Sequence, residues 1–131
     1  MRLLLDTHIL LWVLAEPKRL TPRMRSLITG DGNSSMASAA AIWEIAIKYA
    51  RRRGRADDMP IAGQQALALA ESAGIDLLAI TPGHAAMVDQ LPAIHGDPFD
   101  RIMIAQALDE GMTLLTHDKL LAGYGAFVIV A

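Results

Sequence analysis

The sequence predicts a single α/β domain over residues 1–131, with a mainly parallel five-stranded sheet that carries helices on both faces. Short apolar runs alternate with helix signals from one end of the chain to the other. Apolar residues make up 53% of the chain and the mean hydropathy is +0.31, values that suit a sheet buried on both faces. A length of 131 residues is typical of one domain.

The five strands are short apolar segments that end at turn residues or at acids. They are predicted at residues 2–5, 34–37, 76–80, 113–116 and 127–130. Asp6 follows the first strand, and the turn Asp31-Gly32-Asn33 precedes the second. Because a helix separates most successive strands, parallel pairing is favoured.

Six helices are predicted at residues 9–15, 22–30, 39–53, 60–73, 82–91 and 98–111. Three of them begin with an N-cap residue followed by proline, at Thr21-Pro22, Thr81-Pro82 and Asp97-Pro98. Ser38 is the expected N-cap of the third helix. Proline or glycine is expected to end the helices, at Pro17, Gly30, Gly54, Gly74, Pro92 and Gly111.

The composition excludes several classes of protein. The chain has no cysteine, which removes disulfides and thiolate metal sites and agrees with a cytoplasmic location. No apolar run approaches the length of a transmembrane helix, so we expect no membrane partner. The N-terminal leucines are interrupted by Asp6 and His8 too early for a secretory signal.

The net charge of −2 lacks the basic excess of a general nucleic-acid binder. The exception is a local cluster of four arginines at Arg51, Arg52, Arg53 and Arg55. Such a cluster suits a solvated helix end, where cations meet the negative pole of the helix dipole. Binding of phosphates or of a partner is the other interpretation.

Four acids are placed where a parallel α/β sheet binds its ligands, beyond the carboxyl ends of the strands. Asp6 follows the first strand, and Asp118 follows the fourth. Glu44 lies about two turns into the helix after the second strand. Asp100 lies in the first turn of the helix that leads into the fourth strand. We therefore expect these side chains to converge at one edge of the sheet.

Each acid also has a structural interpretation. Asp6 could simply cap the helix that begins near Ile9, and Asp118 could cap a short turn at residues 119–121. Glu44 could form a surface pair with Lys48 one helical turn later. Against the surface pair, the helix around Glu44 is apolar on two faces and is expected to be mostly covered.

Asp100 is the most informative acid. It shares a helical face with Met103 and Ile104, so it is expected at the top of the buried stripe. Its structural alternative is to support the N-cap at Asp97. Clustered carboxylates repel one another and need a cation, for which Mg²⁺ or Mn²⁺ is the natural choice. A nuclease uses such a site to acidify a water and to stabilise charge on the scissile phosphate.

Four segments resemble the PIN-domain family, and most closely the VapC-type toxins of bacterial toxin–antitoxin pairs. They run in the family's order and spacing: LLLDTHILLW, AAAIWEIAIK, HGDPFDRIMIAQA and LLTHD. The resemblance implies a three-layer α/β/α sandwich and a Mg²⁺- or Mn²⁺-dependent endoribonuclease.

The resemblance also implies roles for individual residues. Asp6 and Asp100 match the main metal ligands, and Asp118 completes the metal site or supports a ligand. Glu44 matches the acid that shares this site and orients or deprotonates the attacking water. Thr116 matches a hydroxyl that steadies a carboxylate or a water.

Other polar residues near these motifs keep open roles. Asp97 is close enough to join the acids, although its N-cap position explains it. His8, His95 and His117 could contact RNA, but single histidines are more often structural.

The family further implies a homodimer that a cognate antitoxin silences, with a C-terminal antitoxin segment in the active-site groove. We expect Trp43 or its neighbours to be covered by the partner subunit or by antitoxin. The arginine cluster would serve RNA or an acidic antitoxin segment. Residues 53–63 match the family poorly, so contacts there stay open.

Two other functions of small α/β domains need a residue that this chain lacks, and a third stays open. A signalling receiver domain needs an aspartate at the end of the third strand, where this chain has Ile80-Thr81. A haloacid-dehalogenase phosphatase needs a second aspartate at the position of His8. The third is a catalytically inactive PIN-fold module that only pairs with an antitoxin. Only an activity assay distinguishes this module from an enzyme.

Overall fold

A computed structural model describes all residues 1–131 and contains a five-stranded sheet in which every neighbouring pair of strands is parallel. The strands are β1 (Arg2–Leu5), β2 (Ser34–Ser38), β3 (Asp76–Leu78), β4 (Thr113–Thr116) and β5 (Val128–Val130). Their order across the sheet is β3-β2-β1-β4-β5. The predicted α/β class is confirmed, and the sheet is wholly rather than mainly parallel.

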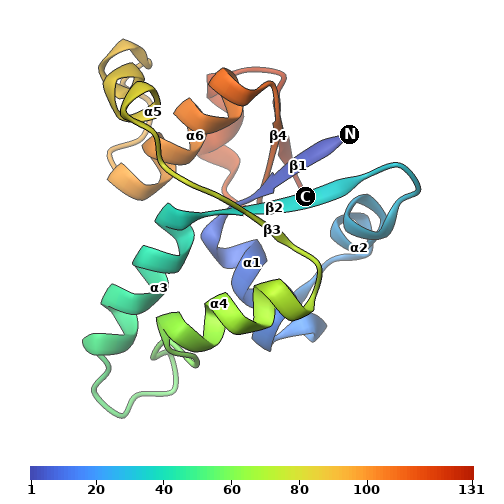
Figure 1. The fold of residues 1–131 in the computed structure, drawn as a ribbon, viewed down its shortest axis with the longest axis vertical. Coiled ribbons are helices and arrows are strands. Elements are labelled where there is room, and N and C mark those ends of the chain that lie inside the picture. Colours follow the sequence, from blue (N-terminus) through green and yellow to red (C-terminus); the bar gives the residue numbers. More distant parts are fainter.

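Six α-helices connect the strands: α1 (Thr7–Ala15), α2 (Pro22–Thr29), α3 (Ala39–Ala50), α4 (Gly63–Ser72), α5 (Pro82–Met87) and α6 (Pro98–Glu110). Figure 1 shows α5 and α6 on one side of the sheet and α1, α2 and α4 on the other. The sheet is therefore the middle layer of a sandwich. Its central strands are the most apolar: Leu3, Leu4 and Leu5 of β1, with Leu114 and Leu115 of β4, have no exposed surface.

The strand order places a topological switch between β1 and β4. From β1 the chain adds β2 and β3 on one side, then returns to add β4 and β5 on the other. The residues that follow β1 and β4 therefore leave the sheet side by side at its carboxyl edge, and the Asp6 amide donates to the Leu115 carbonyl at 3.0 Å. In open parallel sheets such a switch point is the usual place for a ligand.

The segment after α3 corrects the sequence prediction. The helix ends at Ala50 rather than residue 53, and Gly54, with φ of +75°, lies in a loop instead of ending the helix. Asp58 stabilises this loop, because its carboxylate accepts hydrogen bonds from the amides of Arg53 at 3.0 Å and Arg55 at 2.8 Å. These amides are therefore satisfied outside a helix.

Helix α4 begins at Gly63 rather than residue 60. A Cβ on Gly63 would lie 2.8 Å from the Ala46 Cβ, so only glycine allows the start of α4 to pack this closely on α3. Other predicted bounds shift by a few residues, at the start of α1, the ends of β3 and α5, and the start of β5. Three 3₁₀ helices, η1 (Pro17–Arg19), η2 (Val88–Gln90) and η3 (Lys119–Tyr124), complete the chain. Only a turn at 119–121 was predicted among them.

No helix combines the length and the apolar character that crossing a bilayer requires.

Candidate active site

A pocket of about 280 Å³ opens at the carboxyl edge of the sheet and has no hydrophobic residue in its lining. It is lined by Asp6, Thr7, His8, Glu44, Lys48, Asp97, Asp100, His117 and Asp118. All four acids that the sequence predicted to converge thus meet in one pocket, and Asp97 joins them. Five carboxylates face a single lysine there.

Asp6 lies between β1 and α1 and performs two tasks. Its Oδ1 accepts a hydrogen bond from the Ile9 amide at 2.9 Å, so the predicted capping role is confirmed. Its Oδ2 accepts a short hydrogen bond from the buried Thr116 hydroxyl, which in turn accepts one from the Asp118 amide at 3.0 Å. Burial raises the pKa of Asp6, although the bonds from Thr116 and Ile9 act against this.

Asp100 enters the pocket from the first turn of α6, and no donor forms a hydrogen bond with its carboxylate. Burial, followed by the charges of Asp97, Asp6 and Glu44, raises the pKa of Asp100 to about 7, with His95 acting against them. A carboxylate that accepts no hydrogen bond and lies close to other acids is costly in electrostatic energy. Its position is therefore poorly explained by helix capping alone.

Glu44 is only 4% exposed, although it pairs with Lys48 at 2.6 Å between Oε2 and Nζ. The predicted pair one helical turn apart is present, but it is not a surface pair. The Lys48 side chain is 49% exposed, so only the Glu44 carboxylate is withdrawn from water, at a cost that a fully exposed pair avoids. The Glu44 carboxylate therefore lies in the pocket and not on the exposed surface of the helix.

Asp97 and Asp118 both cap the elements that follow them. Asp97 Oδ1 accepts from the amide of Phe99 at 2.8 Å and from that of Asp100 at 3.4 Å. Asp118 Oδ1 accepts from the Leu120 amide at 3.0 Å. The capping interpretation is confirmed for both, and each still lines the pocket.

The three histidines near the motifs lie in different places. His8 and His117 are exposed at the rim, where His8 stacks on Trp12 at 6.3 Å between ring centroids and His117 meets the same ring edge-on at 5.3 Å. His95 instead bonds Asp118 Oδ2 at 3.0 Å and lies 3.6 Å from Asp100 Oδ2. Sequence reasoning missed this contact. Its only signal was the position of His95 two residues before the N-cap Asp97.

The residues of the pocket fit a hard divalent cation. All of the candidate ligands offer carboxylate oxygen, the donor that Mg²⁺ and Mn²⁺ prefer. Beside them the Thr7 hydroxyl is buried without any hydrogen-bond partner, although its residue lines the pocket. Buried polar atoms are nearly always satisfied, so an orphaned hydroxyl among excess acids is consistent with a site for an ion and its waters.

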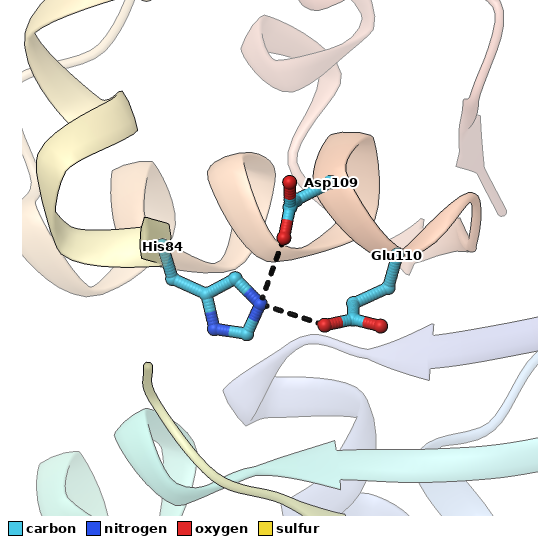
Figure 2. Close-up of side chains that lie close together, drawn as sticks. All are labelled: His84, Asp109 and Glu110. Carbon is cyan, nitrogen blue, oxygen red and sulfur yellow. Dashed lines mark hydrogen bonds and ion pairs between the residues drawn. The ribbon is translucent and has the colours of Figure 1, made fainter. Parts of the chain in front are cut away.

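A second group of possible metal ligands lies at the other end of α6 (Figure 2). His84 Nε2 is 2.9 Å from Glu110 Oε1 and 3.4 Å from Asp109 Oδ2. The His84 Nδ1 accepts a hydrogen bond from the Thr81 amide, so the ring hydrogen is on Nε2 and points at the carboxylates. A metal ion at Nε2 would need the hydrogen moved to Nδ1, against the Thr81 N–H. These residues therefore hold α5 to α6 without an ion.

A wider groove of about 680 Å³ adjoins the acidic pocket and shares His8, Lys48 and His117 with it. Three of the four clustered arginines line this groove: Arg51, Arg53 and Arg55. Their guanidinium groups form no ion pair, whereas Arg52 lies outside the groove and stacks on Tyr49 at 3.8 Å. The groove also carries acids, at Glu16, Asp57 and Asp58.

Comparisons with known proteins agree with this geometry. A family model described as PIN domain matches residues 3–126. The chain is 32% identical to ribonuclease VapC22 of Mycobacterium tuberculosis over 123 residues. This aligned region covers 92% of this chain and 90% of that protein. VapBC2 of Rickettsia felis, solved with a promoter DNA fragment, has a TM-score of 0.69 at 12% identity, over 100% of this chain and 98% of that chain. A toxin–antitoxin complex of Klebsiella pneumoniae has a TM-score of 0.64 at 16% identity, over 97% and 95%.

Proposed function

The chain belongs to the PIN-domain family, and from this premise we propose that it is a metal-dependent endoribonuclease and the toxin of a toxin–antitoxin pair. The observation that carries the proposal is the polar pocket at the switch point. Five carboxylates and a single lysine line it, so its negative charge exceeds its positive charge and favours a bound cation. The 32% identity to a ribonuclease along nearly the whole chain supports the substrate class.

Asp6 and Asp100 would be the main ligands of Mg²⁺ or Mn²⁺, with Asp118 and Glu44 completing the site. Thr116 donates to Asp6 and accepts from the Asp118 amide, so one hydroxyl ties together the residues that follow β1 and β4. When bound, the divalent ion supplies positive charge to the scissile phosphate and acidifies the attacking water. Glu44 would orient that water and accept its proton.

The groove beside the pocket suits an incoming RNA strand. The guanidinium groups of Arg51, Arg53 and Arg55 form no ion pair, and guanidinium binds phosphate through paired hydrogen bonds. The exposed imidazoles of His8 and His117, supported by Trp12, line both the groove and the pocket. An RNA strand that follows the groove would therefore bring a phosphate to the acids.

A second, apolar surface of the chain suits a protein partner. Trp43 is 58% exposed and lines an apolar pocket of about 660 Å³ between α3, α4 and the end of β3. Exposed apolar pockets of this kind are typical of protein interfaces. We assign this surface to a second copy of the chain or to antitoxin, and the relatives solved as toxin–antitoxin complexes support such a partner.

Cleavage of RNA by the purified chain, freed of any bound antitoxin, tests the function. We expect cleavage with Mg²⁺ or Mn²⁺ and none after EDTA is added. Asp6→Asn should lower the rate at least ~10²-fold, since loss of a ligand removes several kcal/mol of charge stabilisation. Cleavage that persists in EDTA, or in Asp6→Asn at the parent rate, would exclude the mechanism. A well-folded chain that binds the metal and cuts no RNA would be the inactive binding module instead.

A further inference from the structure

The imidazole of His95 is held among the acids of the pocket without lining it. Its Nε2 lies 3.0 Å from Asp118 Oδ2 and 3.6 Å from Asp100 Oδ2. On the other side of the ring, Nδ1 accepts a hydrogen bond from the Asp97 amide at 3.1 Å. One ring thus connects three of the five acids.

The partners of the two ring nitrogens fix the tautomer. A backbone amide can only donate, so the His95 Nδ1 presents its lone pair and the ring hydrogen is on Nε2. That hydrogen points at Asp118. A metal ion at Nε2 would displace it toward Nδ1, where the Asp97 N–H already points. The geometry therefore makes His95 a donor to the carboxylates and not a ligand of the cation.

The loop that carries His95 is anchored independently of the acids. The Tyr124 hydroxyl oxygen accepts from the His95 amide at 3.1 Å and from the Arg101 guanidinium at 3.2 Å. The same guanidinium donates to the carbonyls of Val88 and Pro92, each at 2.9 Å, and to that of His95 at 3.4 Å. Arg101 follows Asp100 directly in α6, so the loop and the site share one rigid support.

Asp118 is the residue that gains from this support. Its Oδ1 is held by the Leu120 amide and its Oδ2 by the His95 ring, although its side chain is 38% exposed at the pocket. An exposed carboxylate without these two donors would sample several rotamers. Fixed carboxylates lose less conformational entropy when they bind an ion.

We propose that His95 is a positioning residue that orients Asp118, and through it the carboxylate cluster, for a divalent cation. The inference rests on the proposed function only in taking the acidic pocket as the site of the divalent cation. Residues that orient metal ligands typically change affinity by about 10–100-fold when they are replaced.

Mn²⁺ binding by the intact protein, measured without RNA by calorimetry or by electron paramagnetic resonance, tests the proposal. We expect His95→Leu to raise the Mn²⁺ Kd at least ~10-fold. His95→Gln should stay within a few-fold of the parent, because its amide group can donate at the position of Nε2. His84→Leu is the matched control. It removes the corresponding ring at the other end of α6 and should lower the Tm while leaving the Mn²⁺ Kd unchanged.

A spectroscopic readout separates positioning from ligation. Electron spin echo modulation of bound Mn²⁺ should show no directly coordinated nitrogen in the parent protein. A coordinated nitrogen would make His95 a ligand and overturn the proposal. So would a His95→Leu protein that binds Mn²⁺ as the parent does, or a parent that binds none. If Mn²⁺ binding responds as expected while no RNA is cut, the proposed function fails and the role of His95 stands.

Discussion

The two ends of helix α6 carry nearly the same arrangement of a histidine and two carboxylates. At one end His95 bonds Asp118 at 3.0 Å, with Asp100 at 3.6 Å. At the other end His84 bonds Glu110 at 2.9 Å, with Asp109 at 3.4 Å. In both, Nδ1 accepts from a backbone amide at 3.1 Å, so both rings are donors through Nε2.

The surroundings differ, and they decide which end can bind an ion. The His95 end adds the buried acids Asp6 and Glu44 to the pocket. At the His84 end the ring is fully buried, while Asp109 is 51% and Glu110 34% exposed, so water screens their charges. Three residues in ligand geometry therefore do not define a metal site. An excess of carboxylates that are shielded from water is what marks the His95 end as the metal site.

The largest expected difference between the two ends is in catalysis. Asp100→Asn should lower the rate of Mg²⁺-dependent RNA cleavage by at least ~10²-fold, because it removes a ligand charge from the pocket. Glu110→Gln changes a carboxylate to an amide in the same way at the other end, and should keep the rate within about twofold. Cleavage assays at saturating metal measure both. Equal losses in the two variants would refute the distinction between the ends.

Metal-dependent stability gives the next effect in size. An ion that binds only the folded chain stabilises it by about 2.7 kcal/mol at 100 times its Kd. The parent and Glu110→Gln should both show this gain when Mg²⁺ replaces EDTA in a melting experiment, and Asp100→Asn should lose most of it. If the gain survives in Asp100→Asn but disappears in Glu110→Gln, the ion is at the wrong end of α6 for the proposed site.

The acids of the site could be predicted because their positions follow from strand ends. A parallel sheet brings the residues after β1 and β4 together, and the α6 cap signal at Asp97-Pro98 fixed the first turn that carries Asp100. The strong cap-plus-proline signals likewise predicted the starts of α2, α5 and α6. These features depend on local sequence and on one rule of topology.

Features that depend on individual side-chain contacts were not predictable. The loop after α3 is shaped by Asp58, whose bonds to two backbone amides leave no periodic pattern. The role of His95 depends on Tyr124, which is 29 residues away along the chain. The same holds for His84, whose partner Glu110 is 26 residues away. The sequence showed the residue types, but only the fold shows which charges meet.

The pH dependence of stability in EDTA should also separate the two ends. The pKa of Asp100 is about 7 in the folded chain, whereas an unfolded aspartate has a pKa of about 3.9. Between these values the folded chain holds a proton that the unfolded chain has released. Stability therefore falls as pH rises through this window and is level above it. With allowance for solvent at the pocket mouth, the loss should be about 1–2 kcal/mol.

Denaturant titrations from pH 4 to pH 8 measure this slope. Asp100→Asn should flatten it and should be more stable than the parent at pH 8 without metal. The raised pKa of Asp6 contributes with the same sign, so some slope remains in the variant. Glu110→Gln should keep the parental slope. A parent whose stability rises across this window would contradict the assigned environment of Asp100.

The smallest effect concerns Asp97, which is both a cap and the neighbouring charge that raises the pKa of Asp100 most. Thr81 is the matched cap near His84, since its hydroxyl accepts from the His84 amide at 3.1 Å and carries no charge. Thr81→Ala should cost about 1 kcal/mol of unfolding free energy at both pH 5 and pH 8, because only a cap is lost.

Asp97→Ala should match that cost at pH 5, where Asp100 is protonated and does not repel Asp97. At pH 8 Asp100 is ionised, so loss of the Asp97 charge offsets part of the lost cap, and the cost should fall to about 0.5 kcal/mol. Asp97→Asn keeps the cap and removes the charge, so it should be at least as stable as the parent at pH 8. Denaturant titrations in EDTA measure all three variants. If Asp97→Ala costs the same at both pH values, Asp97 acts as a cap alone and the charge surplus at this end of α6 is smaller than its geometry indicates.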